Sequence, residues 1–188
     1  IQAPLDALLT LRRQHGLTPD NVARIVARLP EDGALIVNDR AVPDVNLQYV
    51  LAVGLVDGTM SFEDSHSPAR MKDPQVLAVK ERVELVPDRA LMDPDAPRSG
   101  RVDVTLRDGR TVTHFTRFPP GTRENPLDTN GVNEKARGLM APILGPDRTG
   151  RAFSTAAAAS LTMSLAWGAR RPASVEPTAS GLAAANSA

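Results

Sequence analysis

The chain has 188 residues, with 22 Lys and Arg against 22 Asp and Glu, so its formal net charge is zero. This balance, with only 3% aromatic residues, gives no reason to expect nucleic acid or an anionic membrane as a partner. Cysteine is absent, which excludes disulfides, thiol nucleophiles and thiolate metal sites. No apolar run approaches the roughly 20 residues of a membrane helix. The N-terminus also lacks the pattern of a signal peptide, so we expect a cytoplasmic protein.

The first elements along the chain are a helix and a half-buried strand. The leucine spacing predicts an amphipathic helix over residues 3–16, ended by Gly16. Residues 22–30 alternate in polarity, which predicts a strand with Ala23, Ile25, Ala27 and Leu29 on its buried side. Residues 31–44 have the composition of a polar loop.

The segment NLQYVLAVGLVDG, residues 46–58, has helical length and too few polar residues for a surface helix. It should lie in the interior or at an interface, and Asp57-Gly58 should end it. Residues 60–74 look irregular. Asp73 and Pro74 then predict a capped helix, which leads into a short strand over ERVELVPD.

Residues 101–119 predict a β-hairpin around Asp108-Gly109 with a type I′ turn. Counting outward pairs Leu106 with Thr111, Val104 with Thr113 and Val102 with Phe115, and we expect these six residues to face the core. His114 would then lie opposite Asp103 on the outer face.

The remaining segments are a turn-rich loop over 119–131, a helix over 132–144 and a tail rich in Ala, Ser and Thr. The tail, 146–188, contains one possible helix and otherwise the composition of a flexible segment. The order of elements predicts an α+β domain over 1–145, with a small antiparallel sheet covered by helices on one face.

Few residues suggest chemistry. His15 is expected to be solvated at a helix end, and His114 to form the exposed pair with Asp103. His66 lies on a loop beside Glu63 and Asp64, where it is either an ordinary solvated histidine or an acid–base group. Metal-ligand spacing, a phosphate-binding loop and a nucleophile elbow are all missing from the sequence, so no metal is expected.

Tyr49, the single tyrosine, has two interpretations. A buried phenol normally finds a hydrogen-bond partner, so the simpler interpretation is a core tyrosine anchored to a backbone carbonyl. The alternative is a tyrosine that faces a polar pocket shared with another domain or subunit, where it would bind a carboxylate or transfer a proton. Physical reasoning alone favours the first.

Several stretches in order resemble the C-terminal part of the MmgE/PrpD family: IQAPLDALLTLRRQHGLTPDNVARI, NLQYVLAVGLVDG, DPQVLAVKERVEL, VDVTLRDGRTVT and GTRENPLDTNGVNEKARGL. The family includes 2-methylcitrate dehydratases, cis-aconitate decarboxylases and an iminodisuccinate epimerase. Its members have a large helical domain and a smaller α+β lid, with the active site between them. The resemblance covers most of residues 1–144 and implies that this chain is the lid.

The resemblance also implies roles for individual residues of this chain. The family's Gln-Tyr pair matches Gln48-Tyr49, which implies that Tyr49 points into the interdomain cleft as a catalytic residue. A family histidine aligns with Gln2, which can bind a carboxylate but cannot shuttle protons near neutral pH. His66 is a second, weaker substrate-binding candidate. The family's Gly-x-Pro-x-Asn-Pro pattern has Arg123 in place of its first proline, and the closing tail departs from the family.

The implied function is a lid domain or subunit of a lyase that abstracts a proton next to a carboxylate of a di- or tricarboxylic acid. Dehydration, decarboxylation and epimerisation stay open, and no cofactor is implied. A helical domain would complete the site, on a partner chain of an oligomer or in a longer protein. The alternative is a non-catalytic module that binds a carboxylate or a partner. Tyr49 buried in the module's own core, with its hydroxyl on backbone, would contradict the lyase role.

Overall fold

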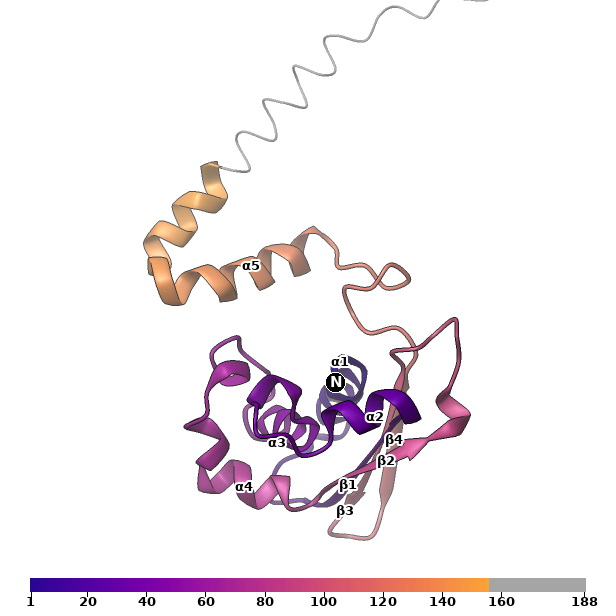
Figure 1. The fold of residues 1–188 in the computed structure, drawn as a ribbon. Helices are drawn as coiled ribbons and strands as arrows, with labels where there is room; N and C mark the ends of the chain where they lie inside the picture. The colour runs from indigo at the N-terminus through magenta and orange to yellow at the C-terminus, as the bar shows by residue number, and fades with distance from the viewer. Residues whose placement is uncertain (156–188) are drawn as a thin grey trace, which may run out of the picture. The chain divides into compact units, whose positions relative to one another are not determined.

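The computed structural model describes residues 1–155 and has the expected α+β fold (Figure 1). The helices are α1 (Gln2–His15), α2 (Glu31–Val37), α3 (Leu47–Asp57), α4 (Pro74–Lys80) and α5 (Thr129–Leu144), with 3-10 turns η1 (Pro43–Val45), η2 (Asp64–His66), η3 (Arg70–Lys72) and η4 (Arg89–Leu91). The strands are β1 (Val22–Pro30), β2 (Val83–Asp88), β3 (Gly100–Leu106) and β4 (Thr111–Thr116). Over residues 1–155, no helix is long and apolar enough to cross a membrane.

The four strands form one sheet in the order β2-β1-β3-β4. β1 pairs antiparallel with β3, and β3 pairs antiparallel with β4. β2 runs parallel to β1, so the sheet is mixed where the sequence predicted an antiparallel one. The parallel pair is possible because α2, α3 and α4 form the long crossover between the two strands.

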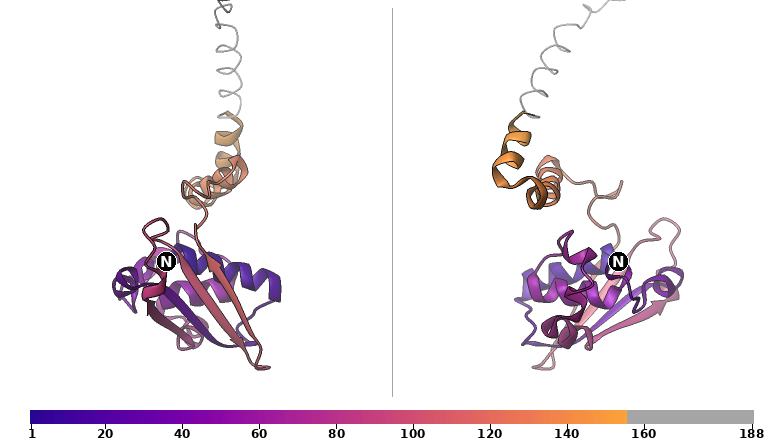
Figure 2. Two further views of the ribbon diagram at one scale, coloured as in Figure 1. Left: turned by 90° about the vertical axis from the view of Figure 1, so that its right-hand side faces the viewer. Right: turned by 60° about the vertical axis from the view of Figure 1, so that its left-hand side comes forward.

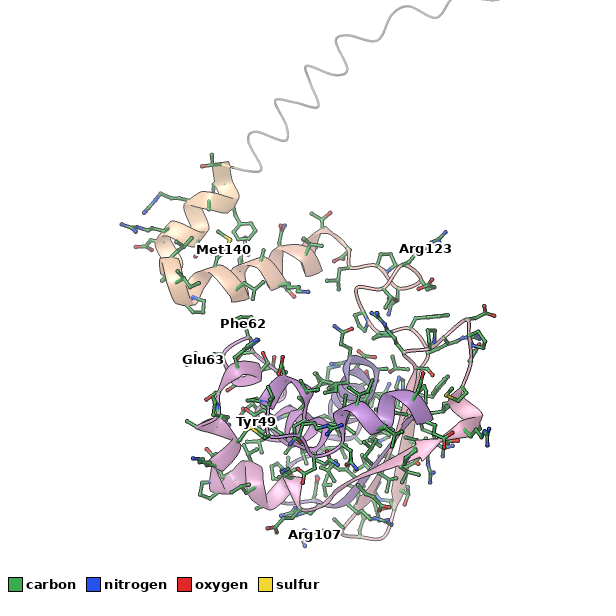
Figure 3. The ribbon with its side chains drawn as sticks, viewed as in Figure 1. Tyr49, Phe62, Glu63, Arg107, Arg123 and Met140 are labelled. Atoms are coloured by element: carbon green, nitrogen blue, oxygen red, sulfur yellow. The ribbon has the colours of Figure 1, made fainter. Side chains whose placement is uncertain are left out.

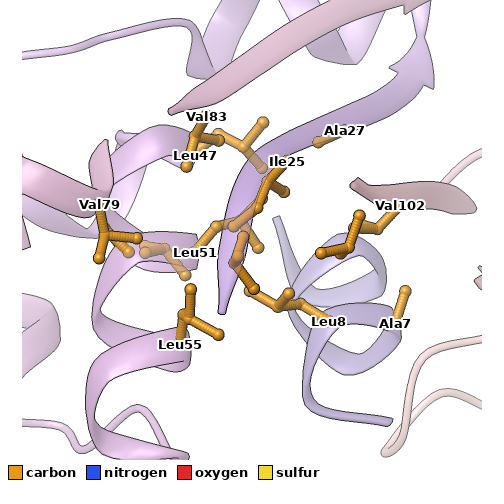
Figure 4. Close-up of a cluster of buried hydrophobic side chains, with 14 of the residues drawn as sticks. Ala7, Leu8, Ile25, Ala27, Leu47, Leu51, Leu55, Val79, Val83 and Val102 are labelled. Carbon is orange, nitrogen blue, oxygen red and sulfur yellow. The ribbon is translucent and has the colours of Figure 1, made fainter. Parts of the chain in front are cut away.

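The hydrophobic core lies between one face of the sheet and helices α1 and α3 (Figures 2 and 4). Ile25 of β1 pairs with Val104 of β3 and contributes to this face, and Leu8 of α1 and Leu51 of α3 are completely buried against it. α4 packs against α3, and α2 packs against β1 and β2. Helix α3 is therefore interior, as its composition predicted, and other parts of this chain cover it.

The hairpin register differs from the predicted one by one residue. Val102 lies opposite His114 and Val104 opposite Val112, so Thr111, Thr113 and Phe115 face away from the helices. The reason is the turn: Gly109 donates to Leu106 O at 3.0 Å and has φ of 88°, which makes a three-residue loop with a glycine bulge. A two-residue turn was assumed, and a one-residue change moves each β4 side chain to the opposite face.

Two further predictions were wrong in detail. Ala23 is exposed, because the β1–β3 register shifts between Val22 and Arg24 and takes Ala23 out of the alternation. The segment 31–44 is not a plain loop, since it contains α2 and most of η1. Helix α2 was missed because it is only seven residues long and exposes Leu35 and Ile36.

The outer face of the sheet is polar and its charges are paired. Arg24 pairs with Glu84 across β1 and β2, and Asp103 accepts from Arg101, Arg28 and Thr113. Burial of Asp103 opposes its ionisation, but these hydrogen bonds and the nearby guanidinium outweigh it, so the pKa of Asp103 lies below its usual value. Each of these charged side chains therefore has a partner of opposite charge within the sheet.

The caps confirm the predicted helix boundaries. Asn46 accepts from the Tyr49 amide at the start of α3, and Asp73 accepts from the Gln75 amide at the start of α4. Gly58 ends α3 with φ of 76°, and Arg12 of α1 donates to Leu55 O at 3.1 Å.

The chain divides into two compact units, Ile1–Leu139 and one beginning at Met140, and the site described below lies within the first. Helix α5 has no buried residue, and residues 146–155 are helical. Most of the helix predicted in the tail, and the rest of the tail, lie outside the described residues.

Candidate functional site

Two hollows meet at the amino end of α1. The first has a volume of about 430 Å³ and lies between α1, α2, η1 and the segment before β3. The second, of about 560 Å³, lies between the segments that precede β3 and follow β4. Gln2, Pro97 and Arg98 line both hollows. Their sizes fall within the usual range for sites that hold small ligands.

The fold brings these segments together through one close contact and one strand pair. A Cβ added to Gly100 would lie 2.8 Å from Pro4 Cδ, so the absence of a side chain allows α1 to approach β3. Gly100 also pairs with Thr116, so residues just before β3 and just after β4 leave the sheet side by side. Thr116 donates to Asp6 of α1 at 2.9 Å, which fixes the helix against β4.

The second hollow is rich in arginine. Arg98, Arg117 and Arg123 line it, together with the carboxylates of Asp95 and Glu124. Arg117 forms an ion pair with Asp93 at 2.9 Å, whereas Arg98 and Arg123 have no salt bridge within residues 1–155. Guanidinium groups bind carboxylates through paired hydrogen bonds, and the positive end of α1, beside Gln2, has no acidic residue in its first turn. The arrangement is therefore suited to holding carboxylates.

Each hollow has one buried hydroxyl in its wall without a partner. Ser99 lines the first hollow and is 1% exposed, and its Oγ has no hydrogen-bond partner among the described residues. Thr122 lines the second hollow, and its Oγ1 is likewise unpaired there. Buried hydroxyls are normally paired, since an unmade hydrogen bond costs about 1–3 kcal/mol.

Tyr49 does not face either hollow. Its side chain, labelled in Figure 3, is 0% exposed in the core. Its hydroxyl donates to the backbone carbonyl of Asp64 at 2.6 Å. Burial and the negative charge of Asp64 raise the pKa of Tyr49, and the guanidinium of Arg70 opposes this. The expectation that Tyr49 points into an interdomain cleft is therefore corrected. Tyr49 is a core tyrosine anchored to a backbone carbonyl, because residues 58–73 of this chain cover the phenol.

That covering segment is held by polar contacts. Arg70 binds Asp57 at 2.8 Å and Asp73 at 2.6 Å, and its Nε lies 3.9 Å from Asp64. The Arg70 guanidinium thus interacts with three carboxylates. The hydrogen bond to Asp57 is the main reason that the pKa of Arg70 lies above its usual value. Neither η2 nor η3 contains a buried residue. Tyr49 and Arg70 therefore anchor the segment, together with Met60 and Met71, which are partly buried against the core.

His66 is exposed in η2 and oriented by the backbone. Its Nδ1 lies 2.8 Å from Phe62 O, and its ring stacks on Phe62 with centroids 4.2 Å apart. Because a carbonyl only accepts, Nδ1 must carry the proton, and the lone pair of the neutral ring is on Nε2. His66 lines neither hollow, so the structure does not bring it together with Gln2.

The other histidines have no candidate role. His15 is exposed at the end of α1, as expected. His114 is half-buried opposite Val102, so the predicted pair with Asp103 was wrong and follows the register correction. Within residues 1–155, no group of three or more His, Asp or Glu side chains is placed to hold a metal ion.

The sequence interpretation named Gln2 as a candidate and did not single out the arginines that line the hollows with it. The signal was present in the hairpin, because any hairpin over 100–116 places residues 97–99 beside 117–123. Both of these segments contain arginine and proline. What the sequence could not give was the approach of α1 to their meeting point.

Comparisons with known proteins show the family to which the chain belongs. The MmgE/PrpD C-terminal domain matches residues 1–159. The chain is 31% identical over 170 residues to a 2-methylcitrate dehydratase-like protein, oryR, of Aspergillus oryzae. The alignment covers 80% of this chain and 34% of that protein, so the chain spans about a third of the length of the relative. The chain belongs to the MmgE/PrpD family, and it corresponds to the family's C-terminal domain.

Proposed function

We propose that this chain is the carboxylate-holding lid of a lyase of the 2-methylcitrate dehydratase type, acting on a di- or tricarboxylic acid. The observation that carries the proposal is the first hollow, where Gln2 and Arg98 lie at the amino end of α1, with Asp44 as the carboxylate in the lining. Family membership and the name of the relative support the substrate class. The alternative is a binding module without catalysis.

The burial of Tyr49 limits what this chain contributes to catalysis. Proton abstraction beside a carboxylate needs a base, and Tyr49 is committed to Asp64 O. This is the result that we stated as contradicting a lyase role, so Tyr49 no longer supports the proposal, which now rests on the first hollow and on family membership. We assign the base to a helical domain that would complete the site. His66, with its Nε2 lone pair directed away from Phe62 O, is the one candidate proton acceptor that we retain on this chain.

The first test is the native mass of the protein isolated from its source, with every co-purifying chain identified. We expect a helix-rich partner at a fixed ratio, or a longer chain that contains both parts. Either result would justify screening citrate-like acids for dehydration, decarboxylation or epimerisation. A lone 20.0 kDa chain, or a simple homo-oligomer of it, would contradict the lyase proposal and favour the binding module.

The second test measures citrate binding by calorimetry in variants of this chain. Arg98→Gln should weaken binding about tenfold or more, because a hydrogen bond to a charged group contributes about 1.5–3 kcal/mol. Arg13→Gln removes the same charge from the exposed opposite end of α1 and should have little effect. Equal losses in both variants would mean that only net charge matters, and the hollow would not be the site.

A further inference from the structure

Residues 58–73, which connect α3 to α4, form a strap over the hydroxyl of Tyr49. Both ends of the strap are breaks in the helical backbone. Gly58 ends α3 in the left-handed region with φ of 76°, and Asp73 is extended before Pro74, which begins α4. The strap is therefore a separate segment, joined to a helix through a single residue at each end.

The strap contributes little to the core. None of residues 58–73 is buried, and its apolar contacts with the core come from Met60 and Met71, which are partly buried. Its η2 turn also contacts η1. By contrast, every residue of α3 from Leu47 to Leu55 is buried. Because segments with few buried apolar groups open at a lower free energy than the core, the strap can leave α3 while the core stays packed.

Two polar contacts connect the strap to α3. The Tyr49 hydroxyl donates to Asp64 O at 2.6 Å, and Arg70 Nη2 lies 3.0 and 2.8 Å from the two carboxylate oxygens of Asp57, the last residue of α3. The ion pairs of Arg70 with Asp64 and Asp73 are internal to the strap. Opening must break the contacts with Tyr49 and Asp57, but it can keep the internal ones.

Backbone hydrogen bonds give the strap a structure of its own. The His66 amide donates to Glu63 O at 3.0 Å, and the Lys72 amide donates to Ala69 O at 3.0 Å. Bonds of this kind have both partners within residues 58–73, so they do not oppose movement of the strap as a whole.

We infer that the strap is a closing element that opens as a unit, with the Arg70–Asp57 pair as its latch, and that its opening uncovers the Tyr49 hydroxyl while the core stays folded. The inference goes beyond the proposed function and does not depend on it. Since His66 lies on the strap, the same movement would displace this histidine. The latch thus controls both the cover over Tyr49 and the position of His66.

Tyr49 gives a direct readout, because it is the single tyrosine of a chain without cysteine. Tetranitromethane nitrates accessible phenols, and the absorbance of nitrotyrosine gives the rate. On the full wild-type chain we expect slow nitration that is nearly independent of urea at low concentrations, because local opening exposes little surface. A rate that follows the urea dependence of global unfolding from the lowest concentrations would overturn the inference, since unfolding alone would then expose Tyr49.

A matched pair of variants tests the latch. Arg70→Gln should raise the nitration rate in low urea about tenfold, because it removes the charged hydrogen bonds to Asp57. Val104→Ala removes buried methyl groups from β3, so it should lower global stability and leave the nitration rate near that of the wild type. Equal acceleration in both variants, or no acceleration in Arg70→Gln, would contradict the latch.

Hydrogen exchange of the wild-type chain adds a test that needs no variant. The Val50 amide of α3 donates to Asn46 O at 3.0 Å and should stay protected under the conditions in which Tyr49 is nitrated. Exchange of the α3 amides at the same opening rate would mean that the helix itself unfolds, and the strap would not be a separate unit. These readouts involve neither substrate nor partner, so their failure would leave the proposed function undecided.

Discussion

Gly100 offers the sharpest test of how the fold builds the site. Replacing it with alanine would place a Cβ 2.8 Å from Pro4 Cδ, 3.0 Å from Pro4 N and 3.2 Å from Leu29 Cδ2. Carbon atoms in contact prefer a separation of about 3.5–4.0 Å. Two of these three neighbours belong to a proline ring at the start of a helix, which cannot rotate away. The first turn of α1 would have to move away from β3.

The expected cost follows from this overlap. Adding a methyl group to a packed site typically destabilises a protein by about 1–3 kcal/mol, and the alanine side chain offsets less than about 1 kcal/mol through lower chain entropy. For a chain of this size, each kcal/mol lowers the unfolding midpoint by about 2–4 °C. With a net cost of about 1–2 kcal/mol, we expect a decrease of about 2–8 °C for Gly100→Ala. Citrate binding should also weaken, because Gln2 and Arg98 flank the contact.

The assay is thermal unfolding followed by circular dichroism, with Gly33→Ala as the matched control. A Cβ at Gly33 meets nothing within 4 Å, and its backbone is helical, so this substitution should be neutral or slightly stabilising. A midpoint for Gly100→Ala within about 1 °C of wild type would refute the close packing of α1 on β3. The two-hollow site would then lose its structural basis.

Further predictions concern polar contacts of three residues, Tyr49 and Asn46 in the core and Asp103 on the outer face of the sheet. Tyr49→Phe should lower the free energy of unfolding, measured in urea, by about 0.5–1.5 kcal/mol. The reason is that Asp64 O would then accept only from the Ser67 amide at 3.4 Å. Unchanged stability would show that the phenol does not anchor the segment. If the protein is assayed with its helical partner, Tyr49→Phe should retain substantial activity, and complete loss of activity would restore a direct role. Asn46→Ala should lower the free energy of unfolding by about 1–3 kcal/mol, since it removes the α3 cap and leaves Arg40 O unpaired. The control Asn130→Ala, at an exposed site, should change stability little. Similar losses in the two variants would contradict the capping role of Asn46. The pKa of Asp103 is lower in the folded chain than in the unfolded one, so its contribution is present above about pH 4 and is lost as pH falls through the folded value. Asp103→Asn should therefore flatten the acid side of the stability curve, and an unchanged slope in urea midpoints would contradict this.

The sequence by itself determined the elements whose signals are local. The leucine spacing of α1, the apolar content of α3 and the alternation of β1 each depend on a repeat that neighbouring residues carry. The caps at Asn46 and Asp73 are equally local, since the side chain binds an amide two or three residues away. The order of these elements predicted the α+β class, which the structure confirms, and the family resemblance implied the same class.

Tertiary structure alone decided the features that depend on contacts between distant residues. The parallel place of β2 depends on how the crossover packs, and the hairpin register on a bulge at Gly109 that a two-residue turn would lack. The direction of Tyr49 was decided by residues 58–73, which close over its hydroxyl. The meeting of Gln2 with Arg98 and Arg123 required α1 to approach β3 at Gly100. The contacts of α1 with Arg98 and Gly100 join residues about a hundred positions apart, and no periodicity or spacing in one sequence records them, because their free energy belongs to the packed chain as a whole.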